Sequence, residues 1–228
     1  MSYILESSYG MPCVKYPQNG IFQWDQAKAL KSVGENVIFV AIDLRSIRKK
    51  RKLGVTASIK NDIPVYEVHL PIGPLPIRFR KYIDKIAFSY IYAVIKKKHG
   101  VPKAIHGHFA LYSWGALKMA EKEKIPFVLT EHSSEINEKS RRELHKSKTF
   151  GVYDYVFSKA DKLVAVSSIL AENIRNVYGY EAQVIHNVMD TSSFNGSIAN
   201  PEKLVIVSTG NLIRRKGFDI LLSAIKSS

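Results

Sequence analysis

Short runs of hydrophobic residues alternate along this chain with longer segments in which hydrophobic residues recur every three or four positions. The clearest short run is VIFVAI at 37–42, in which every residue is apolar. Such a strand is typical of a parallel sheet that is covered by helices on both faces. The same kind of pattern predicts strands at 3–6, 37–42, 64–69, 104–108, 126–130, 162–166, 183–186 and 204–208.

The segments between these runs have helical periodicity. Gly34 and Gly100 each follow such a segment, where a residue with a left-handed backbone often ends a helix. Because strands and helices alternate, the sequence predicts an α/β fold with a doubly wound, Rossmann-like parallel sheet. The predicted helices lie at 22–33, 77–98, 114–122, 136–157, 169–177 and 218–226.

A polar segment, DTSSFNGSIANPE at 190–202, divides the chain. Its small polar residues and its proline are typical of a linker. Residues 1–189 have the length of an ordinary domain. Residues 203–228 contain one strand and one helix, and such a pair cannot cover its own apolar faces. We therefore expect 203–228 to be the start of a truncated second α/β domain, which associates with another chain or is poorly ordered.

Composition and charge narrow the class of protein. Of the 228 residues, 46% are hydrophobic, and the formal net charge of +14 favours acidic partners such as phosphorylated ligands, nucleic acid or anionic membranes. Cys13 is the only cysteine, which excludes a disulfide within the chain and favours a reducing compartment. We recognise no signal peptide, and the longest apolar run, 86–95, is too short to span a bilayer. We expect a cytoplasmic protein, soluble or at the inner membrane surface.

Two segments are candidates for contact with an anionic surface. RSIRKKRK at 45–52 carries six cations in eight residues, and it is either a solvated loop or a contact for phosphate, a lipid headgroup or the acceptor. The segment at 77–98 has a broad apolar stripe with cations at both ends. It is either a helix packed on the sheet or an interfacial helix with aromatic residues at the headgroup level. No nucleic-acid-binding module is recognised.

His106 and His108 alternate along a predicted strand and therefore point to the same face. A metal site would need further ligands, and we find no carboxylate or cysteine cluster that accompanies them. The alternative is a position near the carboxyl end of a parallel strand, where ligands gather in such sheets.

Four segments, in this order, resemble the family 4 glycosyltransferases of the GT-B fold. YPQNGIFQWDQAKAL at 16–30 is similar to the first loop and helix of the family, with Asn19-Gly20 where paired glycines are usual. VLTEHSSE at 128–135 resembles the strand that ends in a histidine at the cleft. The third segment, ADKLVAVSSILAENI followed by VIHNVMDTSSF, resembles the end of the acceptor domain, with Asn187-Val188 where Asn-Gly is usual. VSTGNLIRRKGFDILLSAI at 207–225 resembles the start of the donor domain.

The resemblance implies two Rossmann-like domains that face each other across a cleft, in which a sugar nucleotide binds. Gly20, at the start of the first helix, would let backbone N–H groups approach a phosphate. Lys216 matches the family's lysine for the donor diphosphate, and an exposed cation at a helix start is the alternative. Asn211 replaces an arginine that is usual in this motif, so that Arg214 or Arg215 substitutes for it or the phosphate is held more weakly.

His132 matches the family's cleft histidine, which would contact the transferred sugar or the acceptor; a histidine satisfied within the core is the alternative. Glu131 would be structural or would support the histidine. Asn19, Ser133 and His108 are further candidates for the acceptor side of the cleft. No metal and no other cofactor is implied, since lysine and helix-terminal N–H groups would stabilise the leaving diphosphate.

The implied function is retaining transfer of a sugar from a nucleotide-sugar donor to a glycan or lipid-linked acceptor, in a bacterial cell-envelope or capsule pathway. The paired glutamates of the family's donor domain have no counterpart here, so we expect the 228-residue chain to be an inactive fragment. One alternative is a non-catalytic membrane-surface or assembly module with the same fold. Another is a sugar-nucleotide epimerase.

Overall fold

A computed structural model describes residues 2–44, 53–73, 75–191, 196, 205–210 and 212–227, apart from the side chain of Arg215. The basic segment at 45–52 lies outside these residues, as do Asn211 and most of the predicted linker. The chain divides into two compact units, Met1–Asp190 and Thr191–Ser228, and each is described by itself.

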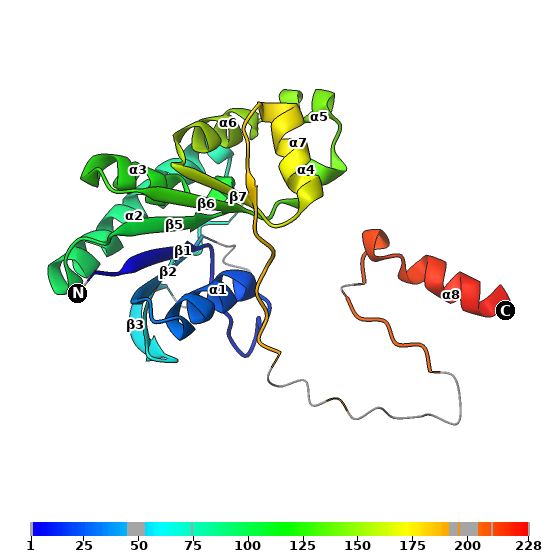
Figure 1. The fold of residues 1–228 in the computed structure, drawn as a ribbon, viewed down its shortest axis with the longest axis horizontal. Helices are drawn as coiled ribbons and strands as arrows, with labels where there is room; N and C mark the ends of the chain where they lie inside the picture. Colours follow the sequence, from blue (N-terminus) through cyan, green and yellow to red (C-terminus); the bar gives the residue numbers. More distant parts are fainter. Residues whose placement is uncertain are drawn as a thin grey trace. The chain divides into compact units, whose positions relative to one another are not determined.

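The larger unit is built on one sheet of eight strands in the order β3-β4-β2-β1-β5-β6-β7-β8 (Figure 1). Neighbouring strands are parallel, except for the antiparallel pair of β3 and β4. The structure therefore confirms a doubly wound α/β sheet that is mostly parallel. The strands are β1 Ile4–Ser8, β2 Val37–Asp43, β3 Gly54–Lys60, β4 Ile63–His69, β5 Ala104–His108, β6 Phe127–Glu131, β7 Lys162–Ala165 and β8 Gln183–Val184.

Helices connect the strands of the larger unit. Gly34, just beyond α1, has a φ of 91°, and Gly100, the C-terminal cap of α2, has a φ of 83°, so both predicted helix ends are confirmed. The helices are α1 Ile21–Ser32, α2 Ile77–His99, α3 Trp114–Glu123, α4 Ser134–Glu138, α5 Arg141–Lys146, α6 Phe150–Lys159 and α7 Ser168–Tyr178, with a 3₁₀ turn, η2, at Ala110–Tyr112.

Strand β2 is buried on both faces because its residues enter two separate cores. Val37, Phe39 and Ala41 pack with Trp24 of α1. The alternate residues Ile38, Val40 and Ile42 belong to the larger core, to which α2, α3, α6 and α7 contribute. In Figure 1, α1 lies on one side of the sheet and α3 and α6 lie on the other. The run at 37–42 is therefore apolar throughout because helices cover both faces of the sheet, as the sequence predicted.

Strand β3 was not among the predicted strands. It forms a hairpin with β4 through Asn61 and Asp62, whose φ angles of 48° and 58° are those of a tight two-residue turn. The strand is mostly exposed, so it lacks the hydrophobic signal by which the other strands were recognised. The Asn-Asp pair was the available signal, because these residues tolerate positive φ better than most.

The single helix predicted at 136–157 is wrong, since the structure has three helices, α4, α5 and α6, in this region. Ser133 caps α4 by accepting a hydrogen bond from the backbone N–H of Glu135. Ser140 begins α5 with a reciprocal capping box that includes Glu143. Serine side chains that bond the backbone in this way start new helices and interrupt a longer one.

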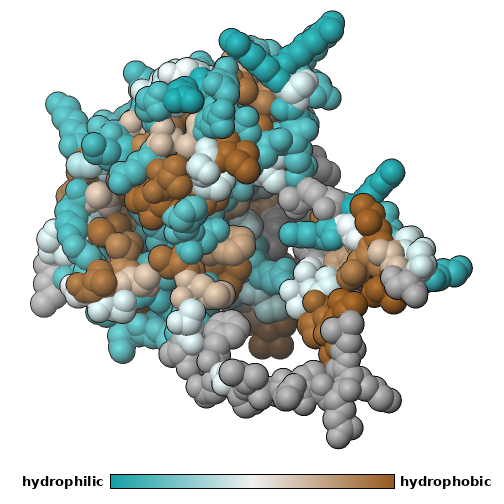
Figure 2. All heavy atoms as spheres, turned by 45° about the vertical axis from the view of Figure 1, so that its right-hand side comes forward, coloured by the Kyte–Doolittle hydropathy of each residue, from teal (hydrophilic) through white to brown (hydrophobic). Residues whose placement is uncertain are grey.

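The smaller unit contains a 3₁₀ turn, η3 Arg214–Lys216, and helix α8 Phe218–Ser227. The strand predicted at 204–208 is wrong for its described part, because Val205, Ile206 and Val207 are in no strand and are exposed. A strand needs a neighbour to bond its backbone, and no strand among the described residues pairs here. No residue of α8 is buried, and hydrophobic side chains of this unit are visible at its surface in Figure 2.

Candidate active site

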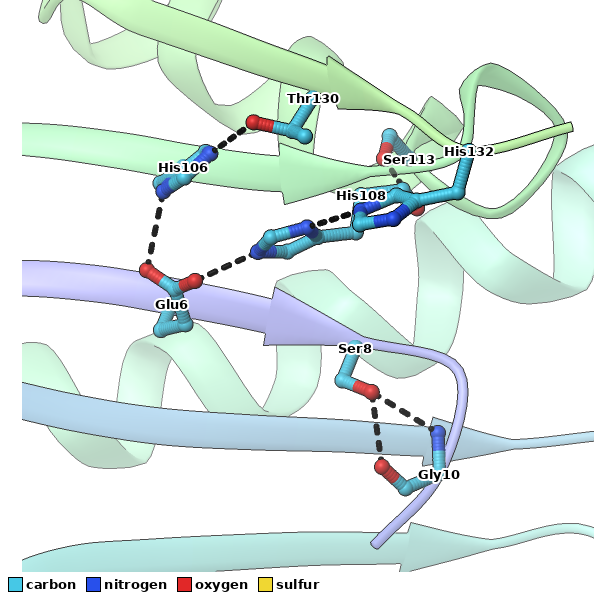
Figure 3. A network of polar contacts seen from close by, with 8 residues as sticks. All are labelled: Glu6, Ser8, Gly10, His106, His108, Ser113, Thr130 and His132. Carbon is cyan, nitrogen blue, oxygen red and sulfur yellow. Dashed lines mark hydrogen bonds and ion pairs between the residues drawn. The ribbon is translucent and has the colours of Figure 1, made fainter. Parts of the chain in front are cut away.

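The carboxyl ends of β1, β5 and β6 lie next to one another in the middle of the sheet. The chain runs from β1 outward through β2 to β4 and then returns to the other side of β1 as β5. In α/β sheets, ligands bind outside the carboxyl ends of the strands at such a switch point. Polar side chains from all three strands gather here (Figure 3).

Glu6 of β1 lies at the centre of this group and is fully buried, with 0% exposure. Its Oε1 is 2.5 Å from Nε2 of His108, and its Oε2 is 3.1 Å from Nδ1 of His106. On the far side of His106, Nε2 lies 2.8 Å from Oγ1 of Thr130. On the far side of His108, Nδ1 lies 3.0 Å from Nε2 of His132, which directly follows β6. Figure 3 shows both branches.

The carboxylate of Glu6 carries the negative charge of this network. Burial by itself raises the pKa of Glu6, but the neighbouring imidazoles of His106 and His108 outweigh this effect and lower the pKa to about 2. Burial lowers the pKa of His108. Burial, reinforced by His108 and His106, lowers the pKa of His132 to about 3. At neutral pH, Glu6 is therefore ionised, and His108 and His132 are neutral.

Glu131 fixes the backbone around His132. Its Oε1 accepts hydrogen bonds from the backbone N–H groups of His132 and Ser133, at 3.0 and 2.9 Å, and its Oε2 accepts one from Ala110 at 2.8 Å. Burial raises the pKa of Glu131 to about 7, and the three N–H groups oppose this shift. Glu131 thus ties the end of β6 to the loop after β5, which agrees with the predicted structural or supporting role.

Aromatic rings flank the side chain of His132. Phe22, in the first turn of α1, stacks on it with ring centroids 6.2 Å apart, and Phe109 stacks at 4.8 Å. Phe109 has a φ of 60°, which is strained for a bulky residue and turns the chain sharply at the end of β5. Two residues earlier, a Cβ at Gly107 would lie 2.6 Å from Oγ of Ser113, so only glycine fits between the two histidines.

Gly20 lies at the N-terminus of α1, as predicted, with a φ of 72°. A Cβ here would lie 2.1 Å from the carbonyl oxygen of Gly10, so the loop that begins with Ser8 closes tightly against the start of the helix. Asn19 is buried and donates from Nδ2 to the carbonyl of Met11 at 3.3 Å, so it holds this loop together. A contact of Asn19 with the acceptor stays a prediction.

Two other predicted acceptor residues have protein partners in the structure. The hydroxyl of Ser133 caps α4 and also accepts a hydrogen bond from Tyr153 at 3.1 Å. His108 is 1% exposed, and both of its ring nitrogens contact protein groups. Strands β1 and β6 enclose His108, and a contact of this residue with the acceptor stays a prediction. It lies behind His132.

In the smaller unit, Arg214 and Lys216 are exposed. The alkyl stem of Lys216 lies against Gly210, since a Cβ at that glycine would be 3.7 Å from Cδ of the lysine. Gly217 ends the basic turn with a φ of 66°. The side chain of Arg215 lies outside the described part. The proposed contacts of Arg214, Arg215 and Lys216 with phosphate stay predictions.

Among the described residues, Glu6, His106 and His108 form the group whose ligand atoms, within 4.8 Å of one another, could hold a metal ion. Oε1 of Glu6 already pairs with Nε2 of His108 at hydrogen-bond distance, and Oε2 faces Nδ1 of His106 at ion-pair distance without an aligned hydrogen bond. The expectation that no carboxylate accompanies the two histidines is wrong, because β1 places Glu6 beside β5. An acidic residue inside an apolar strand was the available signal, since a buried charge needs partners. That the protein needs no metal stays a prediction.

The chain belongs to Glycosyltransferase Family 4, whose model matches residues 23–193, and its α/β sheet has the fold of GT-B glycosyltransferases. TuaC of Bacillus subtilis (strain 168), named as a teichuronic acid biosynthesis glycosyltransferase, is 27% identical in an alignment of 238 positions that covers 95% of this chain and 60% of TuaC. The chain thus spans less than two thirds of this relative.

Two synthases of known structure have the same fold. Sucrose-phosphate synthase from Thermosynechococcus elongatus matches with a TM-score of 0.54 and 15% identity, over 84% of this chain and 91% of that one. The catalytic domain of starch synthase IV from Arabidopsis thaliana, bound to ADP and acarbose, matches with a TM-score of 0.56 and 12% identity, over 85% and 53%. At these identities the likeness concerns the fold alone.

Proposed function

We propose that this chain is the acceptor half of a retaining glycosyltransferase, which moves a sugar from a nucleotide-sugar donor to a glycan or lipid-linked acceptor. The position of His132 carries this proposal, because the residue ends β6 at the switch point of the sheet and stacks on the first turn of α1. The name of TuaC supports a role in polysaccharide synthesis for the bacterial cell envelope or capsule.

In this proposal the leaving diphosphate is stabilised by fixed positive groups. Helix α1 has neither a side-chain cap at Gly20 nor an acidic residue in its first turn, so its first N–H groups are available to an anion. Lys216, with Arg214 or Arg215, supplies the cations from the smaller unit. Such groups stabilise the negative charge that develops on the leaving diphosphate, and no metal is required. His132 orients a hydroxyl of the sugar or acceptor.

The surface of α2 suggests where the acceptor comes from. One face of this helix is in the core, as Phe88, Ile91 and Ile95 show, so the predicted packing on the sheet is confirmed for that face. A second face carries the α2 stripe, which we define as the exposed residues Phe79, Tyr82, Ile86, Tyr90 and Val94, between 41% and 69% exposed.

Cations border the α2 stripe. Arg78 and Lys85 are exposed on the same helix. An apolar stripe with aromatic residues and flanking cations suits the interface of an anionic membrane. We therefore propose peripheral contact with the inner face of the membrane, where a lipid-linked acceptor resides. No helix among the described residues is long and apolar enough to cross a bilayer.

The α2 stripe also favours a second candidate, a non-catalytic membrane-surface or assembly module with the same fold. The two candidates differ in whether a donor half is joined to the chain. The test is to read the coding sequence beyond Ser228 and to assay its product for transfer from radiolabelled nucleotide sugars to membrane extracts. Transfer that is lost in His132→Ala supports the enzyme. Membrane binding without transfer from any donor supports the module.

A further inference from the structure

The hydrogen bonds that join Glu6, His108 and His132 can run in only one direction. An ionised carboxylate accepts and cannot donate, so Nε2 of His108 must carry the proton that faces Glu6. A neutral imidazole has a single N–H, so Nδ1 of His108 is an acceptor and Nε2 of His132 must donate to it. Nδ1 of His132 is then left without a proton.

We propose that Glu6 is a positioning residue: acting through His108, it fixes His132 as the Nε2–H tautomer, so that Nδ1 is presented as the acceptor for a sugar hydroxyl. That a sugar hydroxyl is the donor rests on the proposed function, whereas the tautomer does not depend on it. Glu6 and His108 touch no substrate in this arrangement. His132 alone makes the contact.

Burial protects the relay, by which we mean the hydrogen bonds from Glu6 through His108 to His132. Glu6 is 0% and His108 is 1% exposed, so water does not compete for their hydrogen bonds. Nδ1 of His132 is itself buried without an aligned partner among the described residues. The side chain of Asn187 approaches the ring and acts to raise its pKa, against the effect of burial. A buried acceptor without a donor is unfavourable, and a hydroxyl placed at Nδ1 would remove that cost.

The substitution Glu6→Gln would replace the carboxylate, which only accepts hydrogen bonds, with an amide that can also donate one. Glutamine can turn its NH₂ group toward Nε2 of His108, which then accepts, and the His108 proton moves to Nδ1. Nε2 of His132 becomes the acceptor in turn, and the His132 proton moves to Nδ1. The isosteric change thus removes the requirement that fixes the proton order in both rings, whereas Glu6→Asp keeps a carboxylate and keeps that requirement.

The decisive measurement is the tautomer of each ring, read from long-range ¹H–¹⁵N spectra of the 228-residue chain labelled with ¹⁵N-histidine at neutral pH. The chain has seven histidines, so His108→Gln and His132→Gln assign the two signals. We expect Nε2–H at both rings in the wild type and in Glu6→Asp, and the appearance of Nδ1–H at His132 in Glu6→Gln. Thr130→Val, which removes only the partner of His106, should leave the His132 tautomer unchanged.

The wild-type spectrum decides even if Glu6→Gln fails to fold, because Nδ1–H at His132 would overturn the relay. A transition metal on Nε2 of His108 would also force the proton to Nδ1, so a His108 signal that EDTA converts to Nε2–H would overturn it as well.

In the complete transferase, Glu6→Gln should lower kcat by about 10²-fold or more with KM for the donor within about 3-fold, since a wrong tautomer misplaces a proton without removing a binding contact. The wild-type tautomer with no transfer by any form would count against the proposed function alone.

Discussion

The ring of Phe22, in the first turn of α1, stacks on the ring of His132 with the two planes inclined by 15°. This contact joins the loop that ends in Gly20 to the end of β6, although the two segments are more than a hundred residues apart in the sequence. The contact places His132 beside the first turn of α1, which begins directly after Gly20.

We expect Gly20→Ala to destabilise the larger unit by about 1–3 kcal/mol, because the left-handed backbone strains alanine and the new Cβ would meet the Gly10 carbonyl at 2.1 Å. Gly34→Ala is the matched control, since Gly34 has a φ of 91° but no atom within 4 Å of a Cβ. Urea unfolding measures both. Equal losses would show that strain alone, and not the close approach to Gly10, makes Gly20 necessary.

Stability should fall with acid partly because of His132. Its pKa is lowered from 6.5 to about 3 in the folded state, so the unfolded chain binds a proton at this ring first as the pH falls below 6.5. The folded state is then disfavoured progressively until the pH reaches about 3. Between pH 7 and pH 5 this one group should remove about 2 kcal/mol from the free energy of unfolding.

His132→Gln should lack that part of the loss, and unfolding in urea at both pH values measures it. His145→Gln, at an exposed position, is the control and should keep the wild-type pH dependence. A loss between pH 7 and pH 5 that is the same in His132→Gln as in the wild type would show that His132 is not held neutral by burial.

Binding to vesicles should depend on the α2 stripe. We expect the triple change Tyr82→Ser, Ile86→Ser and Tyr90→Ser to weaken sedimentation with phosphatidylglycerol vesicles by about 10-fold or more, because burying these side chains supplies most of the apolar contact. Binding should also fall steeply as salt rises. Ile59→Ser, at a residue of β3 that is 75% exposed, is the control. Equal binding to neutral vesicles would contradict the proposed attraction between the cations of α2 and anionic lipid headgroups.

In the complete transferase, Lys216→Ala should lower transfer by roughly one to three powers of ten, the scale for loss of one charged contact in the transition state. His132→Ala should impair transfer while nucleotide affinity stays nearly unchanged. Lys226→Ala, at an exposed position of α8, should change neither.

The 228-residue chain should bind nucleoside diphosphates weakly and only at low salt. Tight, salt-resistant binding by titration calorimetry would mean that the donor half has been misassigned.

The smaller unit should promote self-association of the 228-residue chain. Ile220, Leu222 and Ile225 of α8 are between 48% and 71% exposed, and burying such residues against a second copy is favourable. Sedimentation velocity should therefore show a concentration-dependent increase in mass that Ile220→Ser with Leu222→Ser abolishes. Val33→Ser, which removes an exposed side chain of the larger unit, should not abolish it.

The sequence by itself determined most elements and the positions of two candidate site residues. The run at 37–42 predicts a strand buried on both faces because its apolar pattern is local, and β2 has that burial. His132 was found because VLTEHSSE resembles the family's strand that ends in a histidine. Gly20 was found because YPQNGIFQWDQAKAL resembles the family's first loop and helix. In each case the evidence lies within about one element of the chain.

Only the tertiary structure decided the partners of these residues. Glu6 and His108 are 102 positions apart, and they meet because β1 lies between β2 and β5 in the sheet. The pairing of strands depends on the packing of the whole chain, and no local pattern encodes it. For the same reason the sequence did not show that His108 is buried between β1 and β6, where it links the carboxylate of Glu6 to His132.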